Sequence, residues 1–254
     1  MTALAIAAAA ATGVQVGAAM VATRFVVDQT SPASLALLRY AIGLATLLPV
    51  VLATPGTPIA VRDRMPICLL GIGQFGVLIA LLNFGLQTVP AGRAALVFAT
   101  FPLLTLLLAA ALGHERLTPA KLAGVLLTIV GVGAALGDRS SLASAAGIGD
   151  LAVLASALVG AVCSILYRPY LRRYAALPVS ALAMLASVVF LAAIAAYEGF
   201  FSHSPTIDAA GWKAIAFIGV SSGVGYFLWL YALRHLAATR VTVARPTFSP
   251  AMII

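Results

Sequence analysis

The side chains of this sequence that can do chemistry are few, and they lie within long apolar stretches. Three are neutral amides, Gln15, Gln74 and Asn83, and one, Arg39, carries a full charge. A guanidinium in such a stretch can attract a carboxylate or another anion, or it can extend to water at the end of the stretch. The amides can line a polar path for a solute or join neighbouring helices. Both interpretations are open for all four residues.

Two aromatic residues, Tyr226 and Trp229, are three positions apart in another apolar stretch, a spacing that places them on one face of a helix. They can form a cavity wall, although Trp and Tyr also gather at membrane surfaces. Their position in the middle of the stretch favours the cavity. The candidate residues for a solute path are therefore Gln15, Arg39, Gln74, Asn83, Tyr226 and Trp229.

The sequence predicts no catalytic centre, metal site or cofactor. Its three histidines are scattered between apolar stretches, and its two cysteines lie within them, so neither type has metal-ligand spacing. Residues 71–76 match a dinucleotide-binding fingerprint letter by letter. However, no strand precedes them, and no acidic residue follows at the distance that a ribose contact requires. Small residues that allow close helix approach explain the match better.

The elements that position these residues are predicted to cross a membrane. The chain is 63% hydrophobic and only 9% charged, whereas soluble domains average about 25% charged. The apolar runs are continuous, unlike the alternating segments of an outer-membrane barrel. We therefore predict an all-α polytopic membrane protein. The candidate spans are 1–23, 40–61, 65–92, 94–113, 122–137, 151–167, 174–197 and 214–233, with part of a ninth at the end.

Charge predicts the orientation of these spans. With a cytoplasmic N-terminus, ten of the fifteen basic residues fall in inside loops. The positive-inside rule then favours that orientation, although Arg24, just after the first span, locally favours the reverse. The expected location is the bacterial cytoplasmic (inner) membrane. The net charge of +8 is thereby explained without nucleic acid as a partner. The inside residues are Arg62, Arg64, Arg116, Lys121, Arg168, Arg172, Arg173, Arg234, Arg240 and Arg245.

Glycines four positions apart are predicted to let helices pack closely. They form three pairs: Gly13 and Gly17, Gly133 and Gly137, and Gly219 and Gly223.

The sequence also contains an internal repeat. Residues 76–93 and 223–240 are identical at six of 18 positions, and further matches keep nearly the same shift. This predicts a first repeat at 1–137, a polar linker at 138–149 and a second repeat at 150–254. A unit with an odd number of spans enters the membrane from opposite sides in its two copies, so the repeat is predicted to be inverted.

Two segments resemble the EamA family of the drug/metabolite transporter superfamily. The first comprises residues 21–25, Ser31-Pro32 and Leu38-Arg39. The second runs from Ala94 through Phe101-Pro102 to residues 113–118 and Gly124. The resemblance implies ten helices in two inverted five-helix repeats, with both termini cytoplasmic. The sequence departs from the family by ending within the expected ninth helix, so we expect an incomplete second repeat, truncated at the C-terminus.

These observations predict a secondary transporter of small organic metabolites, such as amino acids or drugs, that works by alternating access. Its expected partners are membrane lipid, a small-molecule substrate and, as a further option, a second copy in a homodimer. Two alternatives remain open. One is a truncated, non-transporting membrane remnant. The other is an intramembrane lipid-modifying enzyme, which is less favoured because the spans lack clustered acid, histidine or cysteine side chains.

Overall fold

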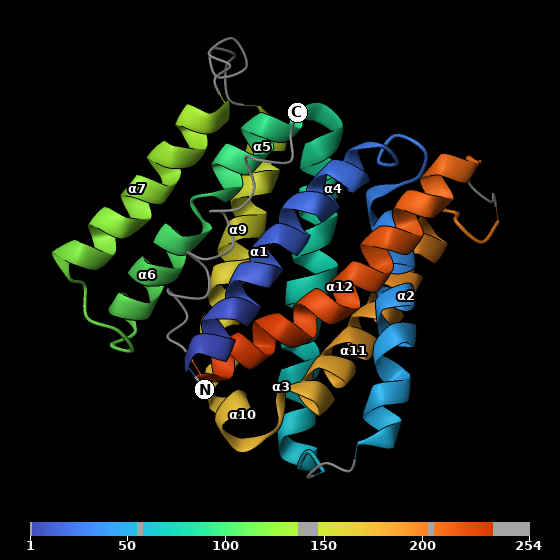
Figure 1. The fold of residues 1–254 in the computed structure, drawn as a ribbon. Coiled ribbons are helices and arrows are strands. Elements are labelled where there is room, and N and C mark those ends of the chain that lie inside the picture. Colours follow the sequence, from blue (N-terminus) through green and yellow to red (C-terminus); the bar gives the residue numbers. More distant parts are fainter. Residues whose placement is uncertain (1, 55–57, 137–146, 203–205, 236–254) are drawn as a thin grey trace.

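The computed structural model describes residues 2–54, 58–136, 147–202 and 206–235, and its regular elements within them are all helices (Figure 1). This confirms the predicted all-α class. In chain order the elements are α1 (Thr2–Arg24), α2 (Pro32–Ala53), α3 (Val61–Gly71), η1 (Ile72–Val77), α4 (Leu78–Thr88), α5 (Ala91–Phe98), α6 (Phe101–Ala111), α7 (Pro119–Leu136), α9 (Ile148–Leu166), α10 (Arg168–Arg173), α11 (Ala176–Tyr197) and α12 (Ala209–His235).

Six helical stretches of the described residues are long and apolar enough to cross a membrane. Helices α1 and α7 pack beside them. The protein is therefore a polytopic membrane protein, as predicted. The six stretches are Pro32–Ala53, Val61–Thr88, Ala91–Ala111, Ile148–Arg173, Ala176–Tyr197 and Ala209–His235.

The second helix differs from the span expected at 40–61. Helix α2 begins at Pro32, because the Oγ of Ser31 caps it by accepting a hydrogen bond from the backbone N–H of Ser34 at 3.3 Å. Proline is favourable at the first helical position, where its missing N–H is not needed. The expected span began after Arg39 because that residue is charged, but Arg39 lies inside α2. Arg39 is therefore seven residues after the start of α2 and not at the end of the span.

Two of the membrane-crossing stretches are irregular, Val61–Thr88 and Ala91–Ala111. Residues 72–77 form η1, a π-helical segment that joins α3 and α4 into a continuous helical stretch of 28 residues. Helices α5 and α6 are separated at Ala99 and Thr100. Pro102 explains this break, since it cannot donate to the carbonyl of Phe98 and its ring would clash with that carbonyl.

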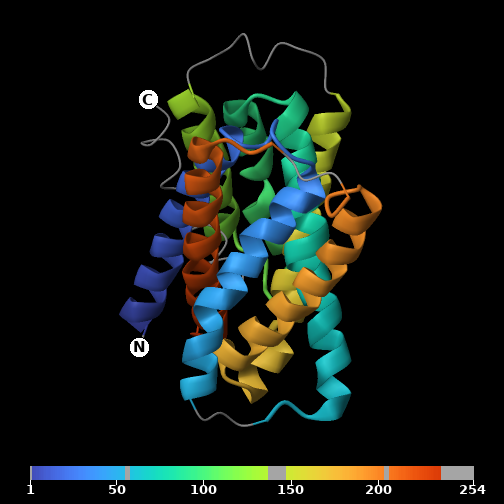
Figure 2. The same ribbon diagram turned by 90° about the vertical axis from the view of Figure 1, so that its right-hand side faces the viewer.

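The bundle has two faces, which Figures 1 and 2 show at the bottom and top. We call the face where α1 begins the N-terminal face, and the face where α7 ends and α9 begins the linker face. Helices α1 and α9 thus start on opposite faces. Helix α12 packs against α1 and α2, α9 packs against α4 and α6, and α11 packs against α2 and α3. Helix α7 lies at one edge, against α5 and α6.

Two predictions fall partly outside the described residues. The predicted linker, 138–149, is described only from Gly147, where the carboxylate of Asp150 accepts the Gly147 N–H at 2.9 Å and so caps α9. The predicted truncation within a ninth helix concerns residues 236–254, which lie outside the described part of the chain.

Candidate functional site

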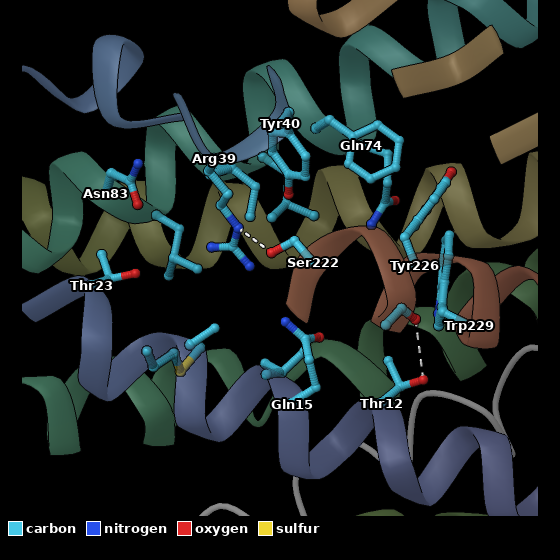
Figure 3. Close-up of a pocket in the computed structure, with 18 of the residues that line it drawn as sticks. Thr12, Gln15, Thr23, Arg39, Tyr40, Gln74, Asn83, Ser222, Tyr226 and Trp229 are labelled. Atoms are coloured by element: carbon cyan, nitrogen blue, oxygen red, sulfur yellow. Dashed lines mark hydrogen bonds between the residues drawn. The ribbon is translucent and has the colours of Figure 1, made fainter. Parts of the chain in front are cut away.

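One cavity brings together all six residues predicted for a solute path. It lies between α1, α2, η1, α4, α5 and α12 and has a volume of about 50 Å³ (Figure 3). Ligand pockets usually hold about 300–1,000 Å³. A solute of more than a few atoms therefore requires the surrounding helices to separate. The six predicted residues on its wall are Gln15, Arg39, Gln74, Asn83, Tyr226 and Trp229.

Arg39 lies in the cavity wall instead of extending to the membrane surface. The residue is only 9% exposed, although it is charged. Its Nε donates a hydrogen bond of 2.7 Å to the Oγ of Ser222, which connects α2 to α12. The guanidinium carbon also lies 5.5 Å from the ring centroid of the neighbouring Tyr40. Among the described residues, no carboxylate lies within salt-bridge distance of Arg39.

The three amides have two different environments. Asn83 donates from Nδ2 to the carbonyl oxygen of Pro32 at 3.0 Å, so it joins α4 to the start of α2. Gln74 lies in η1 and is 5% exposed, and its Oε1 accepts no hydrogen bond from any described residue. The Nε2 of Gln15 likewise has no partner in the described part of the chain. Two amide groups thus offer an acceptor and a donor to a solute.

A row of aromatic rings forms the apolar part of the wall. The ring centroid of Phe75 lies 4.8 Å from that of Tyr40 and 3.9 Å from that of Tyr226. Trp229 stacks on Tyr226 at 5.3 Å and is 1% exposed. A further edge contact at 6.0 Å joins Trp229 to the buried Tyr167. Rings that pack in this way offer a large, rigid apolar surface to a ligand.

Sequence reasoning missed several cavity residues. Tyr40 and Phe75 are each adjacent in sequence to a predicted residue, Arg39 or Gln74, and this adjacency was a usable signal. Ser222 had no such signal, because a serine in an apolar helix usually bonds only to its own backbone. The remaining polar wall residues, Thr12 and Thr23, are on α1 and are missed for the same reason.

The glycines predicted for packing lie in different helices. On α12, a Cβ at Gly219 would lie 2.6 Å from the Cβ of Ile42, and one at Gly223 would lie 2.7 Å from the carbonyl oxygen of Gly43. Both distances are too short for a side chain on α12, and at Gly223 the backbones of α2 and α12 touch. Gly13 and Gly17 are buried in α1, Gly133 lies in α7, and Gly137 is outside the described residues.

The dinucleotide-like segment 71–76 is wholly helical, running from the end of α3 through η1. A strand-to-helix turn, which nucleotide binding needs, is therefore not formed there. A Cβ at Gly71 would lie 2.6 Å from the Cα of Ala183, and one at Gly76 would lie 2.8 Å from the ring of Phe190. Both glycines face α11.

Polar contacts connect the two halves of the chain at the N-terminal face. The carboxylate of Asp63, at the start of α3, accepts a hydrogen bond of 2.7 Å from the hydroxyl of Tyr174. Arg173 lies 3.5 Å from the same oxygen. Asp63 is only 7% exposed, although it lies in the first turn of α3. This contact joins α3 to the segment between α10 and α11.

A second contact joins the two halves at the linker face. Arg93, on α5, donates to both carboxylate oxygens of Asp150, on α9, at 2.7 and 2.9 Å. The two side chains are 10% and 12% exposed. A bidentate pair of this kind fixes both the distance and the orientation of its partners. Both faces of the cavity-bearing bundle are therefore held by polar contacts between the halves.

Comparison with known proteins decides the family. The EamA-like transporter family matches residues 3–136 and 147–254, which is nearly the whole chain. The chain belongs to this family. As an EamA-like protein it is an integral membrane protein of a transporter family, and this membership places it among transporters and not among enzymes. Lipid and a small-molecule substrate are the partners that such a protein contacts.

Relatives of the EamA-like chain carry transporter names. A probable terminal-alkyne amino-acid exporter of Streptantibioticus cattleyicolor is 32% identical over 219 residues, which cover 82% of this chain and 71% of that protein. The aromatic amino acid exporter YddG of Ancylobacter novellus is 30% identical over 178 residues, covering 66% of this chain and 58% of that protein. A solved crystal structure aligns with a TM-score of 0.71 at 25% identity, covering 94% of this chain and 85% of the other.

Proposed function

We propose that this protein is a secondary transporter that exports small organic solutes through the central cavity by alternating access. The observation that carries the proposal is the composition of the cavity wall. Helices α1, α2 and α4 from the first half and α12 from the second half all contribute to it. Secondary transporters place their substrate sites at such an interface between repeats. The names of the exporters to which the chain is similar support the same class of function.

The packing pattern supports two inverted repeats. The shift between the repeated sequences pairs α1 with α9, α2 with α11, and the stretch from α3 to α4 with α12. If each element is exchanged for its counterpart, the contact of α1 with α12 becomes the contact of α9 with α4. In the same way, the contact of α2 with α12 becomes that of α11 with α3. Both contacts of each pair are present, and α1 and α9 start on opposite faces (Figure 2).

Individual glycines follow the same exchange. Gly76 faces Phe190, and Gly223 faces Gly43. The shift of 147 residues that relates the repeated sequences carries Gly76 to Gly223 and Gly43 to Phe190. One contact is therefore the repeat image of the other. This agreement between individual contacts supports the repeat, for which the sequence offers only six identical residues in the best-matched segment.

The charges of the described residues support a cytoplasmic N-terminal face. The linker face has basic residues at Arg24, Arg93 and Lys213 and acidic ones at Asp28, Asp150, Glu198 and Asp208. The N-terminal face has more basic residues, and the positive-inside rule assigns such a face to the cytoplasm. In the described part of the chain these are Arg62, Arg64, Arg116, Lys121, Arg168, Arg172, Arg173 and Arg234.

The same arrangement supports a transport cycle. Alternating access requires one face to open while the other stays closed. In this structure the contact of Asp63 with Tyr174 is formed on one face, and that of Arg93 with Asp150 is formed on the other. With both contacts formed and a cavity of about 50 Å³, the structure resembles an occluded intermediate. Opening either face would release one of the two contacts.

The proposal is tested by measuring efflux of radiolabelled amino acids and organic acids from proteoliposomes that contain the purified chain. We expect at least one solute to leave faster than from liposomes without protein. Ala19 is on the cavity wall and 1% exposed, so Ala19→Phe should fill the cavity and abolish this flux. Ala123→Phe adds the same ring to the exposed surface of α7 and should leave the flux unchanged.

The absence of flux for every solute, with the protein folded, would contradict the proposal. Flux that is equally fast through Ala19→Phe would show that solutes do not pass through this cavity. The melting temperature of each variant, measured in the same detergent before reconstitution, separates a blocked cavity from a misfolded protein. The predicted second copy in a homodimer stays a prediction, which cross-linking in the same vesicles can test.

A further inference from the structure

The cavity contains a positive charge that the described protein does not balance. Among the described residues that line it, Arg39 is the one that carries a charge. The described acidic residues lie at helix ends or between helices, at Asp28, Asp63, Glu115, Asp150, Glu198 and Asp208. A charge held within a membrane is costly unless an opposite charge or water compensates it. A bound anion would supply that compensation.

The guanidinium is held in position for such an anion. The bond from Nε to Ser222 fixes its plane, while its two terminal nitrogens make no hydrogen bond to any described residue. Figure 3 shows Arg39 extending from α2 into the space that faces Gln15 on α1. A planar guanidinium with free donors binds a carboxylate through two parallel hydrogen bonds, which is the geometry that a lysine cannot offer.

The rest of the wall suits an apolar or aromatic body. Tyr40, Phe75, Tyr226 and Trp229 supply a nearly continuous surface of rings beside the guanidinium. The polar atoms available to a solute elsewhere in the cavity are neutral ones, such as the Oε1 of Gln74 and the Nε2 of Gln15. They can pair with a hydroxyl, carbonyl or amide group. An ammonium group would need a carboxylate partner to offset the loss of its hydration, and the described wall has none.

We propose that the cavity binds a monocarboxylate anion with an apolar or aromatic body, in preference to the zwitterionic amino acid of the same shape, and that Arg39 is its carboxylate anchor. This inference rests on the proposed function only for the direction in which the anion moves. Each export cycle would carry one negative charge out of the cell. A membrane potential of 100 mV, inside negative, would then hold the anion concentration outside the cell about 50-fold above that inside, without a coupling ion.

The test begins by measuring the affinity of three probes for the purified chain in detergent. The probes share a phenyl ring and differ in charge: 3-phenylpropionate, phenylalanine and phenethylamine. We expect 3-phenylpropionate to bind at least tenfold more tightly than phenylalanine, and phenethylamine to bind most weakly. Arg39→Gln should weaken binding of 3-phenylpropionate by about 100-fold, the loss expected for a charge-assisted bidentate contact. Arg172→Gln, an exposed change of the same type, should have no effect.

Two further variants keep the test decisive if Arg39→Gln folds poorly. Arg39→Lys retains the charge without the two-pronged geometry, so its affinity for the anion should fall between those of wild type and Arg39→Gln. Ser222→Ala keeps the Arg39 side chain but removes the hydroxyl that accepts its Nε hydrogen bond. It should therefore weaken binding of the anion severalfold. Equal or tighter binding of phenylalanine would overturn the proposal, as would unchanged anion affinity in all three variants.

The flux readout separates this inference from the proposed function. In proteoliposomes with an imposed potassium-diffusion potential, negative inside, efflux of 3-phenylpropionate should accelerate, and reversal of the potential should slow it. Tight anion binding without any flux would refute the transport proposal and leave the anion site standing. Flux of amino acids that is faster than flux of the anion and insensitive to the potential would refute the anion site and leave transport standing.

Discussion

The contact between α3 and α11 provides the sharpest test of the fold. Gly71 lies where these two helices cross, and a Cβ there would be 2.6 Å from the Cα of Ala183 and 2.7 Å from its carbonyl carbon. Ordinary contacts are at least 3.4 Å, so Gly71→Ala would force the helices apart by roughly 1 Å. The movement would also stretch the 2.6 Å hydrogen bond from the Oγ of Ser187 to the Gly71 carbonyl.

The size of this effect can be worked out against a matched control. Overpacking of this kind costs about 1–3 kcal/mol, and a hydrogen bond between membrane helices is worth about 0.6 kcal/mol. Replacing a helical glycine by alanine also gains up to about 1 kcal/mol of helix propensity. Gly131→Ala, in α7, has the same gain and no atom within 4 Å of the new methyl. We therefore expect Gly71→Ala to be roughly 2–4 kcal/mol less stable than Gly131→Ala.

The assay is unfolding by sodium dodecyl sulfate in mixed micelles, followed by tryptophan fluorescence. It reports the free energy of unfolding of each variant relative to wild type. Equal stability of Gly71→Ala and Gly131→Ala would refute the close contact between α3 and α11. It would also remove part of the packing argument for the inverted repeat, since this contact is one of the exchanged pairs.

Two other predictions follow from the polar contacts and the topology. Asp150→Asn removes the negative charge that pairs with the largely buried Arg93, and it should destabilise the protein by roughly 3 kcal/mol in the same unfolding assay. Asp28→Asn, in an exposed pair, should cost less than about 1 kcal/mol. Equal losses of stability would contradict the interpretation of the buried pair. A single cysteine that replaces Ser202, on the linker face, should react with an impermeant maleimide added to intact cells. A single cysteine that replaces Thr118, on the opposite face, should react only after the cells are lysed. The reverse pattern of labelling would contradict the proposed orientation.

The sequence predicted the helical membrane class because apolar runs leave few other structures for a backbone in lipid. Helix starts were harder to place, since they depend on local caps. The Ser31 cap and Pro32 start α2 well before the charge-free run begins at residue 40. Hydrophobicity alone does not detect such a cap. The span was therefore predicted to begin too late, because the charge of Arg39 was taken to lie outside the helix.

The candidate site was predicted only in part, for a related reason. Arg39, Gln74 and Asn83 were identified because polar groups are rare in apolar helices, and the structure brings all of the predicted path residues to one cavity. Phe75 was missed because it has the same type as the residues that fill a core. Ser222 was missed because its role depends on a partner 183 residues away, and sequence periodicity carries no information about such a pairing.

The most direct test of the central claim is whether a solute passes through this cavity. A single cysteine at Thr23, on the cavity wall, is introduced after Cys68→Ser and Cys163→Ala replace the two native cysteines. Solute efflux from proteoliposomes is then measured before and after reaction with a sulfonate-bearing methanethiosulfonate reagent, and again after reduction. Transport through the cavity predicts that flux stops on modification and returns on reduction, while a cysteine at Thr118 has no effect. Flux that continues unchanged through fully modified Thr23→Cys protein would contradict the account.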